Sequence, residues 1–250
     1  DVAQNYVVQL PAIGATSTRG MPVEIVDIDG DGDNDLVEAG DSELLVHVNP
    51  GDGTSNFATS TVPLGSVVID FASGELTGDG IGDIAVLVRE DGGGGLDEAR
   101  ATARLVIVSG ADRSAEPETI RGELDYVFAP AARLDDQHRL ILLEVVDANG
   151  DNRDDILVVE AVGDEEATPV LFARGAAGWS QAPPVDDVIP EIPTRVRFAD
   201  VTSDGSLDLL VFVESNRVLG FAGVSGAQPS FELRESLVLD GGDIAVAELN

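Results

Sequence analysis

The sequence contains no cysteine and no lysine, and it has few aromatic residues. A chain without cysteine can form neither a disulfide framework nor a zinc–thiolate site. Aromatic residues make up 4% of the sequence and hydrophobic residues 43%, so a core must consist mainly of Val, Leu, Ile and Ala. No apolar run reaches the roughly 18 residues that a membrane-spanning helix needs, so we expect no membrane insertion.

Basic residues are also scarce, because 14 arginines face 47 acidic residues and the net charge is −33 at pH 7. A charge of this sign repels nucleic acids and anionic membranes, so neither is expected as a partner. The absence of lysine has two interpretations. One is a GC-rich genome, and the other is adaptation to concentrated salt, in which an acidic surface stays hydrated.

Four nine-residue segments share one pattern of acidic, small and apolar residues. They begin at intervals of about 50 residues, apart from a longer second interval that contains a polar insertion around Asp91–Gly95. Each segment follows a short β-like stretch and precedes an apolar run such as Ile84–Val88. No long segment shows helical periodicity, so each repeat is predicted to contain strands joined by turns. The segments, called loops 1 to 4 below, are Asp27–Asp35, Glu75–Asp83, Asp147–Asp155 and Asp200–Asp208.

The residue types inside the loops predict a calcium site in each. Positions 1, 3, 5 and 9 carry oxygen-bearing side chains in all four copies, and Ca²⁺ takes about six to eight oxygen ligands. Positions 4 and 6 are mostly Gly or Asn, which tolerate the positive φ that lets a loop fold around an ion. Position 7 varies freely, as expected of a ligand that donates only its backbone carbonyl. The predicted ligands at positions 1, 3, 5, 7 and 9 are Asp27, Asp29, Asp31, Asp33 and Asp35 in loop 1; Glu75, Thr77, Asp79, Ile81 and Asp83 in loop 2; Asp147, Asn149, Asp151, Arg153 and Asp155 in loop 3; and Asp200, Thr202, Asp204, Ser206 and Asp208 in loop 4.

Two other interpretations of the loops are metal-free Asp–Gly hairpin turns and EF-hand loops. Four copies at a regular spacing disfavour the first, because the converging acids would repel one another without a cation. Loop 1 has Glu38 at the twelfth position, where an EF-hand needs glutamate, but the other copies have valine there. Their flanks are also typical of strands, whereas an EF-hand needs helices.

The pattern D-x-D-x-D-G-x-x-D followed by an apolar strand resembles the FG-GAP repeat of integrin α-subunit propellers and the related VCBS repeat of bacterial surface proteins. The segment Asn49–Phe57 is also similar to a turn that often follows the loop in those repeats. The resemblance implies an all-β fold, a β-propeller of four-stranded antiparallel blades in which each Ca²⁺ loop joins the first two strands. It implies up to four Ca²⁺ ions, with positions 1, 3, 5 and 9 of every loop as side-chain ligands.

The spacing of the repeats sets the expected domain organisation, a single propeller region over residues 1–250. Asp243–Asn250 matches the strand that leads into a loop, so both ends are expected to be cut through blades. Since similar propellers have about seven blades, we expect an open, incomplete arc of a larger propeller. The expected blades span residues 21–65, 66–136, 137–190 and 191–240, with partial blades at 1–12 and 241–250.

The predicted function is adhesion or ligand binding by an extracellular or cell-surface module, with Ca²⁺ stiffening the loops. Its partner would be a protein or glycan, further copies of the chain, or the rest of its own chain. We expect no catalytic residues: His47, in an alternating apolar strand, is expected to point outward, and His138 to lie in a solvated loop. Two alternatives are the propeller domain of a polysaccharide lyase and a Ca²⁺-bridged structural unit of a surface layer or filament.

Overall fold

The computed structural model describes residues 23–53, 56–90, 102–110, 119–120, 140–162, 166–175, 178–181, 189–191, 193–213, 215, 217–224 and 230–238. Within these ranges every regular element is a β-strand, so the prediction of an all-β fold is confirmed. Because none of these residues is helical, this part of the chain holds no apolar helix that could cross a membrane. The expected partial blades at 1–12 and 241–250 lie outside the described residues, as do Asp91–Gly95 and His138.

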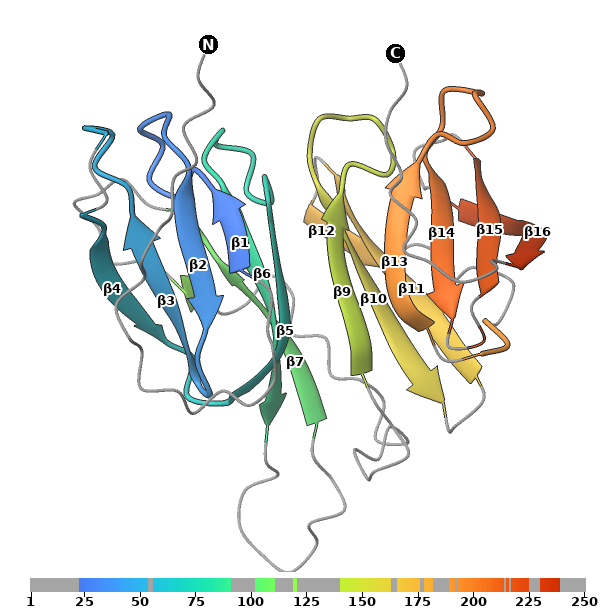
Figure 1. Ribbon diagram of the computed structural model, residues 1–250, viewed down its shortest axis with the longest axis horizontal. Helices are drawn as coiled ribbons and strands as arrows, with labels where there is room; N and C mark the ends of the chain where they lie inside the picture. Colours follow the sequence, from blue (N-terminus) through green and yellow to red (C-terminus); the bar gives the residue numbers. More distant parts are fainter. Residues whose placement is uncertain are drawn as a thin grey trace, which may run out of the picture.

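The strands form four separate antiparallel sheets of four strands each (Figure 1). The first sheet contains β1 (Val23–Val26), β2 (Asp35–Ala39), β3 (Glu43–Val48) and β4 (Ala58–Pro63). The second contains β5 (Val67–Gly74), β6 (Asp83–Glu90), β7 (Thr102–Val108) and β8 (Thr119–Ile120). The third contains β9 (Leu140–Val146), β10 (Asp155–Val162), β11 (Glu166–Gly175) and β12 (Gly178–Gln181). The fourth contains β13 (Pro193–Ala199), β14 (Asp208–Val213), β15 (Arg217–Val224) and β16 (Ser230–Val238).

Within each sheet the strands pair in chain order, so every sheet is a simple up-and-down meander. Each acidic loop joins the first strand to the second. The residue before the loop pairs with its ninth residue, as Val26 does with Asp35 and Val146 with Asp155. The loop is therefore closed at its base by the strand ladder, which fixes the two ends of the acidic segment.

The apolar core is divided into three layers, one between each pair of consecutive sheets. On β6, Ile84 and Val86 pack toward the first sheet, whereas the alternate residues Ala85 and Leu87 pack toward the third. Successive side chains of a strand point to opposite faces, so a strand with both faces covered needs an unbroken apolar run. This is why an unbroken apolar run follows loops 2 and 3 directly, whereas β2 and β14 each place only alternate residues in a core layer.

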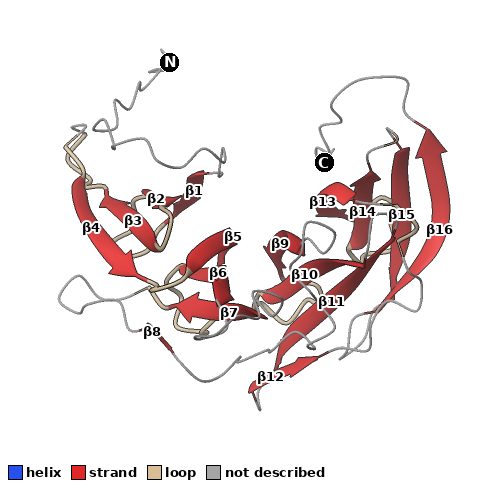
Figure 2. Cartoon of the chain, turned by 90° about the horizontal axis from the view of Figure 1, so that it is seen from below, coloured by secondary structure: helices blue, strands red, loops and turns tan. Residues whose placement is uncertain are grey.

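Figure 2 shows the four sheets one after another along an open curve, with β1, β5, β9 and β13 toward its inner side. These first strands contact one another in sequence: β1 with β5, β5 with β9, and β9 with β13. Polar contacts accompany each junction. The Ser73 hydroxyl donates to Glu24, the Leu143 amide donates to Asp70, and Arg197 pairs with Glu144.

His47 differs from expectation. It follows Val46, which packs between the first and second sheets, so its side chain points to the opposite face of β3. It is nevertheless fully buried, with Nδ1 2.9 Å from Oγ1 of Thr59 and Nε2 3.9 Å from a carboxylate oxygen of Glu38. The alternating pattern identified the face correctly, but it could not show that this face is covered at His47.

Candidate metal centre

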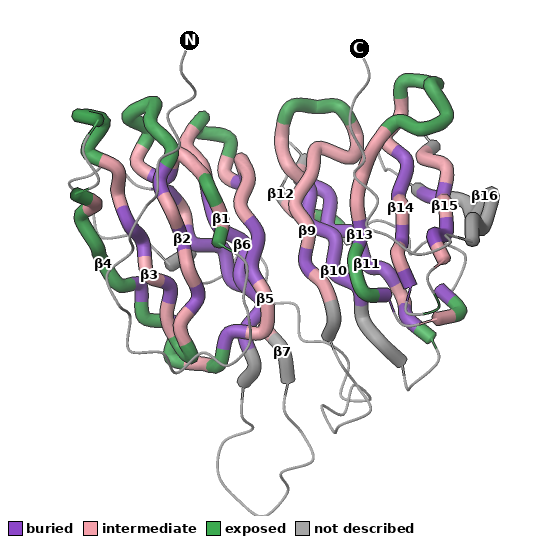
Figure 3. The backbone as a smooth tube through the Cα atoms, viewed as in Figure 1, coloured by how far each residue is buried: buried purple, intermediate pink, exposed green. Residues whose placement is uncertain are grey.

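The four acidic loops lie along the same edge of the sheets, the upper edge in Figure 1, and their tips are exposed (Figure 3). Positions 4 and 6 have positive φ in every loop, as predicted from their composition. Two of these residues are not glycine: Asn152 at φ 64° and Ser203 at φ 58°. The four loops thus share one backbone conformation despite their different sequences.

The first position of each loop acts as an acceptor for the loop's own backbone. In loop 1 the Asp27 carboxylate accepts the amides of Gly30, Asp31 and Gly32 at 2.9–3.1 Å. Asp147 accepts the amides of the same three positions, 4, 5 and 6, in loop 3. Glu75 accepts those of positions 4 and 5 in loop 2, and Asp200 accepts those of positions 5 and 6 in loop 4. This carboxylate therefore holds the turn closed and is fixed in place by it.

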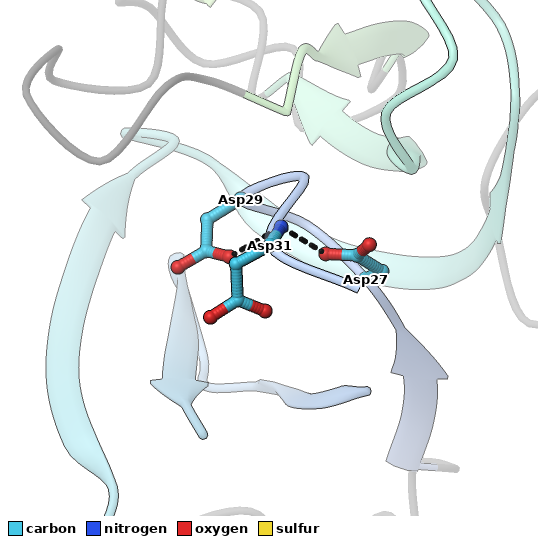
Figure 4. Close-up of side chains that lie close together, drawn as sticks. All are labelled: Asp27, Asp29 and Asp31. Carbon is cyan, nitrogen blue, oxygen red and sulfur yellow. Dashed lines mark hydrogen bonds between the residues drawn. The ribbon is translucent and has the colours of Figure 1, made fainter. Parts of the chain in front are cut away.

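Positions 3 and 5 turn their oxygens into the same loop. Asp29 accepts the Asp31 amide at 3.3 Å, and Asp31 in turn accepts the Asp33 amide at 3.0 Å. Figure 4 shows the side chains of Asp27, Asp29 and Asp31 gathered around the loop. One carboxylate oxygen of each lies within 4.8 Å of the others, a spacing that a single ion could bridge.

Position 9 has a role that the sequence did not reveal. Asp35, Asp83, Asp155 and Asp208 are buried. In each, one carboxylate oxygen accepts the amide of position 2, and the other accepts an amide near the end of the third strand of the sheet. The ninth residue thus anchors the loop to its sheet, whether or not it also binds metal.

Burial affects the acidity of these anchors. Burial raises the pKa of Asp155 to about 6, although the amides of Arg174 and Ala148 act in the opposite direction. Burial also raises the pKa of Asp35 and of Asp83. A carboxylate that is costly to bury in its charged form is one that a bound cation would stabilise.

Loop 2 provides a test of whether the donors fit a cation. Carboxylate oxygens of Glu75, Asp79 and Asp83 lie within 4.8 Å of one another. Thr77 at position 3 has a buried hydroxyl oxygen without a hydrogen-bond partner. This residue lies near Asp83 and acts to lower the pKa of that acid, against the larger opposite effect of burial. Three carboxylates beside an unsatisfied hydroxyl form an all-oxygen donor set, which fits a hard cation such as Ca²⁺.

Loops 3 and 4 have acids at positions 1, 5 and 9, as loop 2 does, but these acids converge less closely. Among the described residues, the groups of three converging acidic side chains are those of loops 1 and 2. Position 3 is neutral in both loops, as it is in loop 2: Asn149 accepts the Asp151 amide, and the Thr202 amide donates to Asp208. The predicted ligands of these loops share the backbone arrangement of loop 1 but offer less negative charge.

Position 7 points away from its own loop. In all four copies its amide donates to the position 5 carboxylate. A Cβ added to Gly51 would clash with the Asp33 carboxylate, so Asp33 lies against the Asn49–Gly53 turn. Ile81 lies beside Gly30 of loop 1, and Arg153 lies beside Gly78 of loop 2. These contacts between loops were not foreseen from the sequence.

Comparison with known proteins gives one family match. Residues 14–86, which include loops 1 and 2, match the model of the FG-GAP-like repeat. No curated protein matches the chain. Among solved structures, a chain of the Photorhabdus luminescens Tc holotoxin pore is similar at 16% identity and a TM-score of 0.34, covering 87% of this chain. The alignment spans 9% of the length of that toxin chain. Over residues 14–86 the chain carries an FG-GAP-like repeat, which confirms the resemblance expected from the loop pattern.

Proposed function

We propose that the four sheets are consecutive blades of a calcium-binding β-propeller arc. Three features support this: each sheet is a four-stranded meander, the first strands line the inner side of the curve, and the acidic loop always joins the first two strands. The FG-GAP-like repeat at residues 14–86 supports the same assignment. The four-fold recurrence of one loop conformation, with oxygen donors at fixed positions, is the observation that carries it.

Ca²⁺ would be held by the side chains at positions 1, 3, 5 and 9 and by the carbonyl of position 7. A carboxylate offers about four lone-pair sites, so one that accepts two or three amides can still bind a cation. The bound ion would neutralise acids that otherwise repel one another and would stiffen the edge of each sheet. Loop 1, with acids at all four side-chain positions, is expected to bind Ca²⁺ most tightly.

Calcium removal tests this proposal. A ligand that binds only the folded state at a hundredfold excess over its dissociation constant adds about 2.7 kcal/mol per site. The melting temperature should therefore fall clearly when Ca²⁺ is exchanged for chelator and should recover when Ca²⁺ is restored. An identical melting curve in both conditions, after metal analysis has verified removal, would contradict calcium binding.

Ligand assignment is tested by a matched pair in loop 1. Asp27→Asn and Asp33→Asn each remove one charge from the same loop without changing side-chain size. Asp27→Asn should weaken calcium binding by about tenfold or more, because a first-position carboxylate is lost. Asp33→Asn should have a smaller effect, since this side chain lies toward Gly51. Equal losses in isothermal titration calorimetry would contradict the assignment of position 7.

We further propose that the module is non-catalytic and extracellular, and that it binds a protein or glycan. The FG-GAP-like repeat supports a structural or binding module, and the net charge of −33 favours neutral or basic partners. A glycan and cell-surface protein array, probed with and without chelator, tests this. Calcium-dependent binding would support the proposal, and bond cleavage in an acidic polysaccharide panel would overturn it.

A further inference from the structure

Backbone hydrogen bonds join loop 1 to loop 2 and loop 2 to loop 3. The amide of Gly82, position 8 of loop 2, donates to the carbonyl oxygen of Asp27, position 1 of loop 1, at 2.9 Å. The amide of Asp154, position 8 of loop 3, donates to the carbonyl oxygen of Glu75, position 1 of loop 2, at 3.0 Å. The same hydrogen bond thus fixes loop 2 beside the first proposed ligand of loop 1, and loop 3 beside that of loop 2.

These hydrogen bonds place the neighbouring position 7 side chain over the preceding loop. A Cβ on Gly30 of loop 1 would lie 3.1 Å from Cδ1 and Cγ1 of Ile81. A Cβ on Gly78 of loop 2 would lie 3.8 Å from Nε and 4.0 Å from Cζ of Arg153. Both glycines hold position 4, so the two contacts are equivalent. Their chemistry differs, because loop 1 faces an apolar side chain and loop 2 faces a guanidinium.

We infer that, where two loops are hydrogen-bonded in this way, the seventh residue of the second loop sets the calcium affinity of the first. Arg153 then weakens calcium binding at loop 2, while Ile81 leaves loop 1 at full affinity. This inference rests on the proposed function. The guanidinium is charged at every physiological pH and would repel a divalent cation bound in the loop that it lies beside. Its half-buried position limits screening by solvent.

The junction between loops 3 and 4 lacks this arrangement and provides an internal control. At each contact between two loops, the residue before the first loop faces position 8 of the second loop. One of these two residues is glycine at the first two contacts: Gly82 at position 8 of loop 2, and Gly74 before loop 2. A Cβ on either glycine would clash with the neighbouring sheet or loop. At the third junction the equivalent residues are Val146 and Leu207. A Cβ on Gly150, position 4 of loop 3, would meet no atom within 4 Å. Ser206 therefore has no equivalent influence on loop 3.

Site-resolved calcium titration tests the inference. Every loop has a glycine at position 4 or 6, so protein labelled with ¹⁵N-glycine carries an NMR reporter in each loop. The amide signals to follow are those of Gly30 and Gly32, Gly78 and Gly80, Gly150, and Gly205. Full-length protein is titrated with CaCl₂ at low and at high NaCl, and each midpoint is assigned to its loop.

Three variants are compared with the wild type. Arg153→Met, similar in size but uncharged, should lower the calcium midpoint reported by Gly78 and Gly80 by about three- to tenfold. Ile81→Arg should raise the midpoint reported by Gly30 and Gly32 by a similar factor. Ser206→Arg should leave the Gly150 midpoint unchanged. The first two effects should shrink at high salt, because they are electrostatic.

The outcomes separate the inference from the proposed function. If no glycine signal of the wild type responds to Ca²⁺, the proposed function fails. If the signals respond but Arg153→Met and Ile81→Arg leave the midpoints of loops 2 and 1 unchanged, the inference fails and calcium binding stands. Arg153→Gln is a second charge-removing variant, and melting in chelator shows whether each variant is folded. An equal shift at every loop would also overturn the inference, since it would indicate a general charge effect.

Discussion

Glu75 and Asp154 are joined by two hydrogen bonds, although they lie in loops that belong to different sheets. The Glu75 amide donates to Oδ2 of Asp154 at 2.7 Å, and the Asp154 amide donates to the Glu75 carbonyl at 3.0 Å. Burial raises the pKa of Asp154, and the carboxylates of Asp147 and Glu75 raise it further. Asp154 therefore joins loop 2 to loop 3 from a position where burial and neighbouring carboxylates disfavour its charged form.

Removal of this side chain should destabilise the protein. Asp154→Ala leaves the Glu75 amide without its acceptor, which typically costs about 1–3 kcal/mol when the group is buried from water. We expect a loss near the lower value, because the buried charge is relieved at the same time. Urea unfolding measures the change in the free energy of unfolding. The control variant is Asp41→Ala, which removes an exposed acid. A loss no larger than that of the control would contradict a joining role for Asp154.

Replacement of Ser203 by glycine should stabilise the folded protein. Its φ of 58° lies in the left-handed region, which costs a non-glycine residue about 1–2 kcal/mol. Glycine removes this strain but has a more flexible unfolded chain, so Ser203→Gly should stabilise the fold by about 0.5–1 kcal/mol. Asn152→Gly should gain less, because asparagine tolerates this conformation. Thermal unfolding compares the two variants, and a destabilised Ser203→Gly protein would refute the prediction.

The buried Asp70 should make the folded protein more stable in mild acid than at neutral pH. Burial raises its pKa from 3.8 to about 6, against the amides of Leu143 and Phe71, and the Glu24 carboxylate raises it further. The folded state therefore keeps a proton that the unfolded chain releases near pH 4. The stabilisation is complete below about pH 4 and is lost as the pH rises through about 6.

Asp70→Asn removes this titration, and the comparison is made at fixed free Ca²⁺. The free energy of unfolding of the wild type, relative to the variant, should fall by on the order of 1–2 kcal/mol between pH 5 and pH 7. Burial also raises the pKa of Glu144, and the nearby Asp70 carboxylate raises it further, so the difference includes the electrostatic coupling between Asp70 and Glu144. A constant difference across this range would show that Asp70 does not titrate there.

Salt should stabilise the protein even when calcium is saturating. The net charge of −33 would stay strongly negative after four divalent ions had bound, so self-repulsion would persist. Raising NaCl from dilute buffer to about 1 M shortens the Debye length to about 3 Å and screens this repulsion. Melting temperature at fixed free Ca²⁺ is the measurement. A flat response would speak against salt adaptation and would favour the genomic explanation of the missing lysines.

The loop conformation could be predicted because its determinants are local. Positions 4 and 6 are Gly, Asn or Ser, and all have positive φ. The unbroken apolar runs after loops 2 and 3 likewise indicate strands with both faces covered, β6 and β10. In both cases the signal lies within a few residues of the feature that it predicts.

The roles of positions 7, 8 and 9 could not be predicted in this way, because their partners are distant. Asp35 reaches the amide of Asn49, 14 residues away, whereas Asp155 reaches that of Arg174, 19 residues away. No constant spacing links these pairs. Arg153 contacts a loop in a different sheet, and its variability suggested only that its side chain was not a ligand.

The single glycine at each of the first two junctions also determines which repeats can be neighbours. Val26 of the first sheet is opposed by Gly82, and Gly74 of the second sheet leaves room for Val145 and Asp154 of the third. A shuffled chain in which the third repeat followed the first would bring Val26 against Asp154, with no small residue on either side. Like the third junction, where Val146 and Leu207 meet, it would be expected to lack the hydrogen bond between loops. The first three repeats are therefore not interchangeable modules, because their close contact depends on the order in which large and small side chains meet.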